Sequence, residues 1–272
     1  MTGLCQKLRI SRQGYYAAHR RRRKQQVDEA FILELVRAER SLQPRIGSRK
    51  LVKILQPQFA EAGVKIGRDR FFELLRRYDL LVEPVAATWP RTTNSRHCLP
   101  IFTNRLKHMK LTGPNQAWVA DITYIRTREG FLYLALITDA FSRKIVGYHV
   151  GESLEVVGCL IALEMAIRGL PAGCIVVHHS DRGSQYCSHA YFEACQAAGI
   201  ELSMTEQLHV YENAKAERVN GILKLEYGLR FEFADKQSAK RAVEQAVYLY
   251  NCRRPHCALN YRTPAEVHGE AA

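Results

Sequence analysis

Long hydrophobic runs are missing from the sequence. No apolar stretch approaches the ~20 residues that a membrane span needs, and residues 1–5 do not have the form of a signal peptide. We therefore expect a soluble, cytoplasmic protein with no membrane partner. Hydrophobic residues make up 47% of the chain and charged residues 25%, which argues against a disordered chain and predicts a globular one.

Paired cysteines are also missing. Eight cysteines are scattered along the 272 residues, and no two of them form a C-x-x-C pair. This spacing argues against a zinc site or a disulfide framework and favours reduced, buried thiols. The adjacent His178 and His179 have no Cys or His partner at zinc-ligand spacing, so we expect them to make hydrogen bonds at the end of a strand.

Acidic residues are scarce in the first part of the chain. Residues 1–80 carry 19 Lys and Arg against 8 Asp and Glu, whereas the remainder is close to neutral, and the whole chain has a net charge of +13. Such an excess on a small domain is typical of proteins that bind the phosphate backbone of DNA. Taken alone, the RRRRK run at 20–24 fits a solvated basic surface equally well. The candidate catalytic carboxylates farther along the chain favour DNA as its ligand.

A small all-α, DNA-binding domain is predicted for residues 1–82. Amphipathic helices are expected at 27–41, 48–55 and 67–80, and Ser11 is expected to cap a short helix before them. The connection at 60–65 allows a helix-turn-helix-like arrangement. Its third helix is expected to face DNA with Arg68, Arg70, Arg76 and Arg77, and its own core with Phe71, Phe72, Leu74, Leu75 and Tyr78. Residues 83–113, punctuated by Pro and Gly, are expected to be a linker in which Trp89 packs on the core.

From residue 114 to 272 the pattern predicts an α/β core. Strands at 118–125, 131–138 and 144–150 are followed by a helix at 154–168, a strand at 174–180, a helix at 189–198, a strand at 200–204, and helices at 211–226 and 237–251. This order predicts a ribonuclease-H-like fold, with helices around a mixed five-stranded sheet. A right-handed crossover would bring the first and fourth strands side by side.

Three acids are distinguished by where they are expected to lie. Asp121 is the single acid inside a strand-like run, where an unpaired charge is costly. Asp181 ends the strand that begins with the apolar run 175–177, at the edge where open α/β sheets place their chemistry. Glu217 shares the polar stripe of helix 211–226 with Lys224. Carboxylate ligands suit Mg²⁺ or Mn²⁺, and two such ions about 3.5–4 Å apart would serve a phosphodiester exchange.

Several motifs identify a resemblance. Thirty-five residues, 182–216, separate Asp181 from Glu217, as in the D,D-35-E core of retroviral integrases and related transposases. More specific are the motifs PNQAW at 114–118, DITYI at 121–125, GFLYL at 130–134, DAFSRKIVG at 139–147, HSDRGSQY at 179–186 and YNCRRPH at 250–256. With them the chain resembles the second-reading-frame (OrfB) product of the insertion-sequence-three family of bacterial transposases, most closely over 114–264. Glu212 stands where many relatives have Asp, at a position expected to face away from the site.

The resemblance implies a DNA transposase in which Asp121, Asp181 and Glu217 are catalytic and hold two divalent ions. Hydrolysis at an element end frees a 3′-hydroxyl, which attacks another phosphodiester without a covalent protein intermediate. Joining of the element's two ends would give a circular intermediate. Lys224 is expected to hold a phosphate, with Arg182 and Gln185 as further DNA contacts. The implied partners are the terminal inverted repeats, target DNA, an upstream helix-turn-helix protein as a frameshift fusion, and further copies of the chain.

Other interpretations stay open. Singly, Asp121 could be salt-bridged, Asp181 could merely start a turn, and Glu217 could pair with Arg218 or Lys224. Asp139 also follows a strand, but its setting favours a turn in which the carboxylate binds local backbone. The main alternative function is a non-catalytic DNA-binding regulator of the fused transposase, against which a slippery heptamer in the coding DNA would argue. A decayed copy fits less well because the acids are intact, and a general nuclease would not explain the basic N-terminal region.

Overall fold

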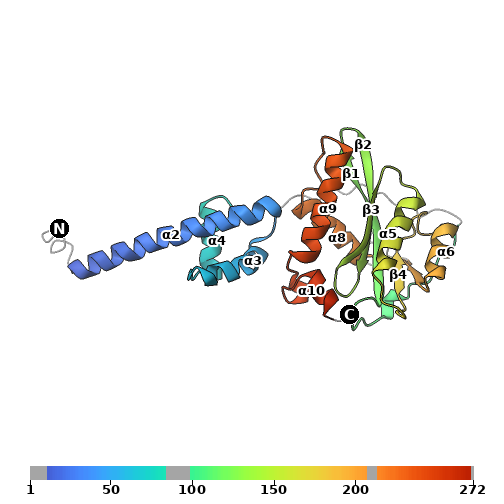
Figure 1. The fold of residues 1–272 in the computed structure, drawn as a ribbon, viewed down its shortest axis with the longest axis horizontal. Helices are drawn as coiled ribbons and strands as arrows, with labels where there is room; N and C mark the ends of the chain where they lie inside the picture. Colours follow the sequence, from blue (N-terminus) through green and yellow to red (C-terminus); the bar gives the residue numbers. More distant parts are fainter. Residues whose placement is uncertain (1–10, 84–98, 207–212, 271–272) are drawn as a thin grey trace. The chain divides into compact units, whose positions relative to one another are not determined.

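The chain folds into two compact units, Met1–Glu83 and Pro84–Ala272. The computed structural model describes residues 11–83, 99–206 and 213–270 (Figure 1). The predictions for Trp89 and for the orientation of Glu212 fall outside the described residues. Within them, no helix is both long enough and apolar enough to cross a membrane.

The first unit contains three helices, α2 (Arg12–Leu42), α3 (Ser48–Glu61) and α4 (Arg68–Arg77). Ser11 caps α2 as predicted, since its hydroxyl accepts a hydrogen bond from the backbone N–H of Gly14. The predicted break before residue 27 is absent, because residues 15–26 are mostly Arg, Lys, Gln and Ala, which are good helix formers. The basic run at 20–24 therefore lies on an exposed part of a continuous helix.

The core of this unit joins all three helices. It is formed by Ile32, Leu33, Val36, Ile46, Leu51, Leu55, Phe59, Val64, Phe71, Leu74 and Leu75. Helix α3 continues past its predicted end and through Pro57, because Phe59 in its last turn packs on Phe71, with ring centroids 6.2 Å apart. The prediction that Tyr78 faces inward is wrong: its side chain is 44% exposed. Tyr78 is the C-cap of α4, where the chain leaves the helical path that carries the apolar stripe.

The second unit is built on the predicted mixed sheet. Its strands are β1 (Ala117–Thr127), β2 (Gly130–Asp139), β3 (Ile145–Gly151), β4 (Val177–Ser180) and β5 (Glu201–Met204), in the order β3-β2-β1-β4-β5. The first three strands form an antiparallel meander, and β4 pairs with both β1 and β5 in parallel. The predicted pairing of the first and fourth strands is confirmed. Strand β1 pairs with β4 only from Ala117 to Val119, so the rest of β1 extends beyond the part that is paired with β4.

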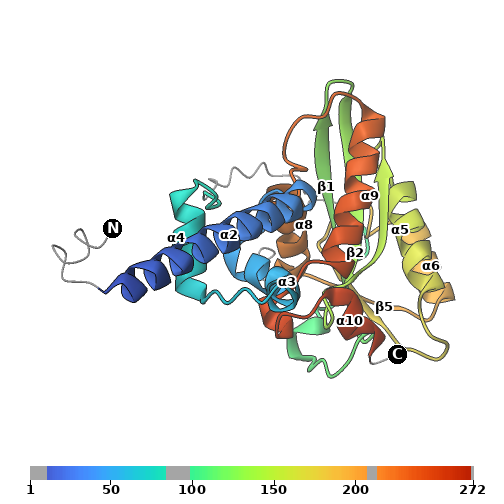
Figure 2. The same ribbon diagram turned by 60° about the vertical axis from the view of Figure 1, so that its left-hand side comes forward.

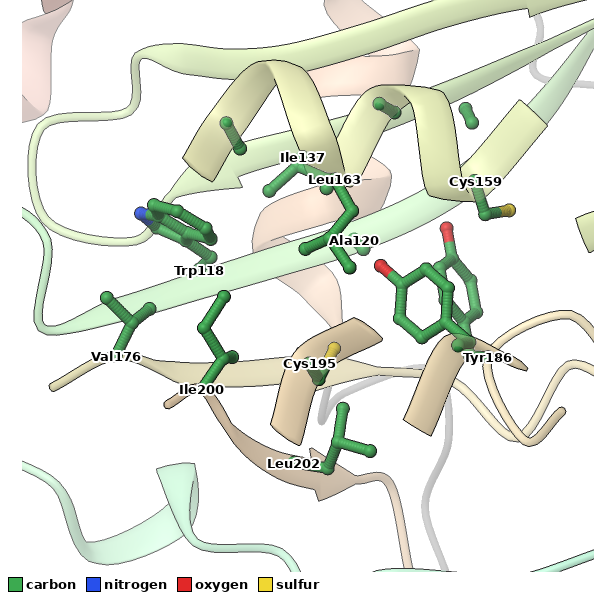
Figure 3. Close-up of a cluster of buried hydrophobic side chains, with 14 of the residues drawn as sticks. Trp118, Ala120, Ile137, Cys159, Leu163, Val176, Tyr186, Cys195, Ile200 and Leu202 are labelled. Atoms are coloured by element: carbon green, nitrogen blue, oxygen red, sulfur yellow. The ribbon is translucent and has the colours of Figure 1, made fainter. Parts of the chain in front are cut away.

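Helices cover both faces of the sheet (Figures 1 and 2). On one face, α5 (Val156–Arg168) and α6 (His189–Ala197) pack on the side chains of Trp118, Ala120 and Ile137, as Figure 3 shows for part of this core. On the other face lie α8 (Ala214–Glu226) and α9 (Lys236–Cys252). Helix α5 approaches very closely at Gly147, where a Cβ atom would stand 2.1 Å from the carbonyl oxygen of Ala162.

Two details of this unit differ from the predictions. The buried run before Asp181 is shorter than expected, because Ile175 lies outside β4 and is 71% exposed. The last part of the predicted linker belongs to the core: Phe102 stacks on Phe192, and the backbone N–H of Arg105 donates to Ser203 Oγ. A polar side chain of β5 thus accepts a backbone hydrogen bond from this segment, and composition alone could not reveal such a contact. A short helix, α10 (Pro264–Gly269), was not predicted and follows a Thr263 capping box.

Candidate active site

Asp121 lies in β1, on the face of the sheet that α8 covers. Its Oδ1 accepts from the backbone N–H of Ile122 at 2.9 Å, and its Oδ2 accepts from Asn220 Nδ2 at 2.8 Å. Burial and the nearby charge of Asp181 raise the pKa of Asp121 to about 7, against the lowering effect of these two hydrogen bonds. The carboxyl group is therefore poised between its neutral and ionised forms near neutral pH.

Asp181 follows β4 directly, and the register of the sheet brings it to Asp121. Trp118 pairs with His178 and Val119 with His179, so continuing the register for two residues sets Asp121 opposite Asp181. The Oδ1 atom of Asp181 accepts from the backbone N–H of Gly183 at 3.0 Å, in the Asp-Arg-Gly turn. The predicted position at a strand end is confirmed, and the two carboxylates repel each other across neighbouring strands.

Glu217 lies in the first turn of α8, on the side facing these two acids. Its side chain is half-buried, and burial together with the charge of Asp181 raises its pKa. Asn213, one turn earlier, donates through Nδ2 to the carbonyl oxygen of Ala120 at 2.9 Å and anchors the start of the helix beside Asp121. Helix α8 thus brings Glu217 within electrostatic reach of the two aspartates, and the joint action of the three acids stays a prediction.

Asn213 and Asn220 are functional candidates whose roles the sequence did not reveal. Both are buried, and each has a side-chain oxygen without a hydrogen-bond partner among the described residues. The available signal was their position: with Glu217 and Lys224 they form one polar stripe along α8. A stripe shows that the residues share a face, but it cannot show which backbone or carboxylate that face meets.

A divalent cation fits the chemistry of this site. Among residues 11–83, 99–206 and 213–270, no three His, Cys, Asp or Glu side chains are drawn together closely enough to hold an ion as they stand. The donors of Asp121, Asp181 and Glu217 are nevertheless all oxygen, which hard cations prefer. Burial, and after it the nearby charge of Asp181, raises the pKa of Asp121 and of Glu217, and a bound cation would remove the repulsion.

The predicted DNA-contact residues near the site already have protein partners. Lys224 Nζ lies 4.3 Å from the ring centroid of Tyr124; burial lowers its pKa, while the nearby charge of Asp121 raises it. Arg182 Nε donates to the carbonyl oxygen of Thr205, and Gln185 Nε2 to that of Leu154, both at 2.7 Å. Lys224 lies on the face of α8 that carries Glu217, whereas Arg182 and Gln185 lie in the loop that follows β4.

The four predicted arginines of α4 are all exposed on the first unit. Arg68 pairs with Asp69 at 2.8 Å, while Arg70 and Arg77 reach Glu29 at 4.0 and 3.4 Å. The guanidinium groups of these pairs are exposed, although Glu29 is half-buried, and ion pairs with an exposed member contribute little to stability. These arginines can therefore exchange partners at small cost. They remain predicted DNA contacts.

Asp139 has the structural role predicted for it. It is fully buried, and its carboxylate accepts hydrogen bonds from the backbone N–H groups of Asn115 and Ser142 and from the Ser142 hydroxyl, at 2.7–2.8 Å.

The prediction that His178 and His179 make hydrogen bonds is confirmed. His178 Nε2 lies 2.7 Å from the Tyr191 hydroxyl, and His179 Nδ1 lies 2.8 Å from Ser203 Oγ. The described cysteines are free thiols, but the expectation that they are buried is wrong for Cys252 and Cys257, which are exposed.

Known protein families match this unit. Residues 112–209 match the family described as integrase core domain, and residues 198–264 match a second family of the same description. A chain of the simian T-cell lymphotropic virus intasome, solved in complex with PP2A regulatory subunit B56 gamma, is similar in fold. It shares 20% sequence identity with a TM-score of 0.50, over 83% of this chain and 71% of that one. The predicted fold class is confirmed.

Relatives extend the similarity over nearly the whole chain. The 31 kDa protein of insertion element IS600 from Shigella sonnei is 36% identical over 268 residues, which is 96% of either chain. Transposase InsF for insertion sequence IS3A from Escherichia coli K12 is 33% identical over 234 residues, covering 82% of this chain and 77% of the relative. Both matches extend beyond the integrase core, so the basic helical unit is shared as well.

Proposed function

The chain belongs to the insertion-sequence-three family of transposases with an integrase core domain, and we propose that it cuts DNA at the ends of its element and joins them to a second phosphodiester. The observation that carries this proposal is the group of Asp121, Asp181 and Glu217. Carboxylates that raise one another's pKa are unfavourable for the fold, and such groups are concentrated at functional sites.

Asp121, Asp181 and Glu217 would hold two divalent cations, Mg²⁺ or Mn²⁺. When bound, the cations supply positive charge to the reacting phosphate and acidify the attacking hydroxyl or water. The role of the protein is then to position groups. Asn220 fixes one oxygen of Asp121 and leaves the other to Ile122 N–H, while Asn213 holds α8 against β1 so that Glu217 faces the strand ends.

Lys224 would hold the phosphate next to the one that reacts. Its ammonium group is close enough to Asp121 for the charge of that residue to raise the Lys224 pKa, against the lowering effect of burial, and it lies on the same helix face as Glu217. A flexible lysine acts as a point charge that adapts to a phosphate, whereas Arg182 is tied to the Thr205 carbonyl. We therefore rank Lys224 above Arg182 and Gln185 as a DNA contact.

The basic helical unit would bind duplex DNA at the element's terminal repeats, and the core would act on those ends and on target DNA. The exposed run at 20–24 and the arginines of α4 supply the positive charge for phosphate contacts. Because two ends must be joined, the active form would contain more than one copy, and the upstream reading frame would add its helix-turn-helix protein by fusion. The place of action would be the bacterial cytoplasm, on the nucleoid.

Cleavage and strand transfer on labelled element-end DNA test the proposal. The wild-type chain and Glu217→Gln are compared with Mg²⁺ or Mn²⁺ present, and the binding of the same DNA is measured in parallel. We expect metal-dependent products from the wild type, and a loss of about a thousandfold or more in the variant with DNA binding retained.

Binding without cleavage by both proteins would contradict the enzymatic proposal for this chain alone. Repeating the assay with the fused upstream frame then separates two cases. Activity of the fusion would make the chain an incomplete enzyme, and inactivity would favour a non-catalytic regulator of transposition.

A further inference from the structure

An exposed aromatic surface lies beside the carboxylate group, and its aromatic rings have no role in the proposed function. Phe131, the second residue of β2, is 50% exposed, and its ring meets Tyr124 of β1 edge-on with centroids 5.6 Å apart. The Nζ atom of Lys224 sits over the ring of Tyr124 at 4.3 Å. We call Tyr124, Phe131 and Lys224 the aromatic platform.

The topology of the sheet explains why the platform is open. Tyr124 and Arg126 point to the same side of β1 as Ala120 and Ile122, which pack beneath α5, but they lie farther along the strand. Phe131 is paired directly across from Arg126, in the outer part of the β1–β2 hairpin. Since β4 pairs with β1 only as far as Val119, Lys224 of α8 can reach Tyr124 around the uncovered edge.

The segment that follows α8 adds a second exposed ring to this edge. The backbone N–H of Arg230 donates to the carbonyl oxygen of Lys224, and that of Phe233 donates to the carbonyl oxygen of Arg126. Phe231 lies between these two anchors and is 58% exposed, with the guanidinium of Arg230 at 5.6 Å from its ring. Phe131 and Phe231 are therefore two exposed rings on segments that backbone hydrogen bonds join to each other.

The charges around the platform favour an anionic ligand. The cations on the same segments are Arg126, Arg128, Lys224 and Arg230, and the acids are Glu129, Glu226 and Glu232. Of these acids, Glu226 is paired with Arg254, and Glu129 accepts from the backbone N–H of Lys236. Aromatic rings interleaved with cations are the pattern by which proteins hold unpaired nucleotides, because rings stack on bases and cations bind the phosphates.

We propose that the aromatic platform binds an unpaired nucleotide of the strand being cut, at the element end. The inference rests on the proposed function and extends it, because the proposed function requires only contacts to duplex DNA. A base inside a duplex has both faces covered by its neighbours, so an exposed phenylalanine gains little from it. Lys224 connects the platform to the carboxylates, since it contacts the Tyr124 ring and interacts with Asp121. An unpaired base on Phe131 would thus fix the strand next to the reacting phosphate.

Binding of two DNAs without divalent cation tests the proposal independently of catalysis. One DNA is a fully paired element-end duplex, and the other has its last three nucleotides mispaired and carries 2-aminopurine among them. We expect the wild-type chain to bind the splayed DNA about tenfold more tightly and to quench the 2-aminopurine fluorescence. Phe131→Ala should abolish both effects and leave the affinity for paired DNA within about twofold. Phe131→Leu, which keeps an apolar side chain but cannot stack in the same way, should behave like the alanine variant.

Tyr248→Ala is the matched control, because Tyr248 is a 65% exposed aromatic residue of α9 outside the platform, and it should behave as wild type. A preference for splayed DNA that survives Phe131→Ala, or equal affinity of the wild type for both DNAs, would overturn the inference and leave the proposed function standing. Failure of the wild type to bind either DNA would count against the proposed function itself.

Discussion

Two aspartates of the same sheet, Asp139 and Asp121, have opposite electrostatic surroundings. Asp139, at the end of β2, is surrounded by donors: two backbone N–H groups, the Ser142 hydroxyl, and His268 beyond it. Asp121, on the next strand, receives two donors but also faces the carboxylates of Asp181 and Glu217. The first carboxylate is stabilised by its hydrogen bonds, whereas the second is the one that we propose binds a cation. The number of donors compared with the number of neighbouring carboxylates therefore distinguishes these two acids.

The largest expected effect comes from making the same substitution in both places. Asp121→Asn should lower strand transfer by about a thousandfold or more, because a ligand is lost from the reacting centre. Asp139→Asn should keep activity within about threefold at 25 °C but lower the melting temperature by about 5–10 °C. The amide leaves a buried donor without an acceptor, at a cost on the order of 2–4 kcal/mol. Activity assays and thermal melts of both variants check this.

The comparison would break if Asp139→Asn, still folded, lost as much activity as Asp121→Asn. Asp139 would then act on the reaction and not only on the fold. It would also break if Asp121→Asn lowered the melting temperature as much as Asp139→Asn does.

An intermediate effect is expected from Asn220→Ala. Asn220 lowers the pKa of Asp121 through its hydrogen bond, so its removal should raise that pKa further and lower activity about 10–100-fold. The acid limb of the pH–activity profile should move to higher pH, because Asp121 must be ionised to act. Asn251→Ala is the control, because Asn251 is also an asparagine that makes side-chain hydrogen bonds to a strand. It binds the backbone N–H and carbonyl groups of Ile145 on β3 and makes no hydrogen bond to Asp121. Asn251→Ala should lower stability without moving the acid limb of the pH–activity profile. A shift of that limb in both variants would show that it does not arise from the hydrogen bond between Asn220 and Asp121.

The smallest effect is a dependence of stability on pH. The pKa of Asp121 is raised to about 7 in the folded chain, above its usual value in an unfolded chain of about 4. The folded state therefore holds the proton more tightly, and stability falls as the pH rises from about 4 to about 7. Asp121→Asn removes this penalty, so its melting temperature should exceed that of the wild type by a few degrees at pH 8 and by less at pH 5. Thermal melts at both values decide it, and an advantage that is constant with pH would refute the assignment.

The sequence predicted the sheet because each strand carries its own signal. Apolar runs and alternation located five strands, and the rule for crossovers placed β4 beside β1, which is enough to bring Asp121 to Asp181. Glu217 was found because polar residues separated by one or two turns share a helix face. Local pattern therefore predicted the backbone positions of all three acids.

What the sequence could not predict depends on partners that are distant along the chain. The hydrogen bond from Asn220 to Asp121 spans 99 positions, and that from Asn213 to the Ala120 carbonyl spans 93. Ile175 resembles a buried strand residue until the strand is seen to begin two residues later. Likewise, Phe131 lies beyond Tyr133, where the pairing of β2 with β3 ends, and its exposure depends on that distant strand.

The contact between Ser142 and His268 has a consequence for the gene. The hydroxyl of Ser142 donates to Asp139, so it accepts from His268 Nδ1, 3.0 Å away and 126 codons downstream. His268 itself is buried. A nonsense or frameshift mutation before codon 268 would thus remove a piece of the interior. Copies of such an element that have lost codon 268 should therefore encode a less stable protein, even where Asp121, Asp181 and Glu217 are intact.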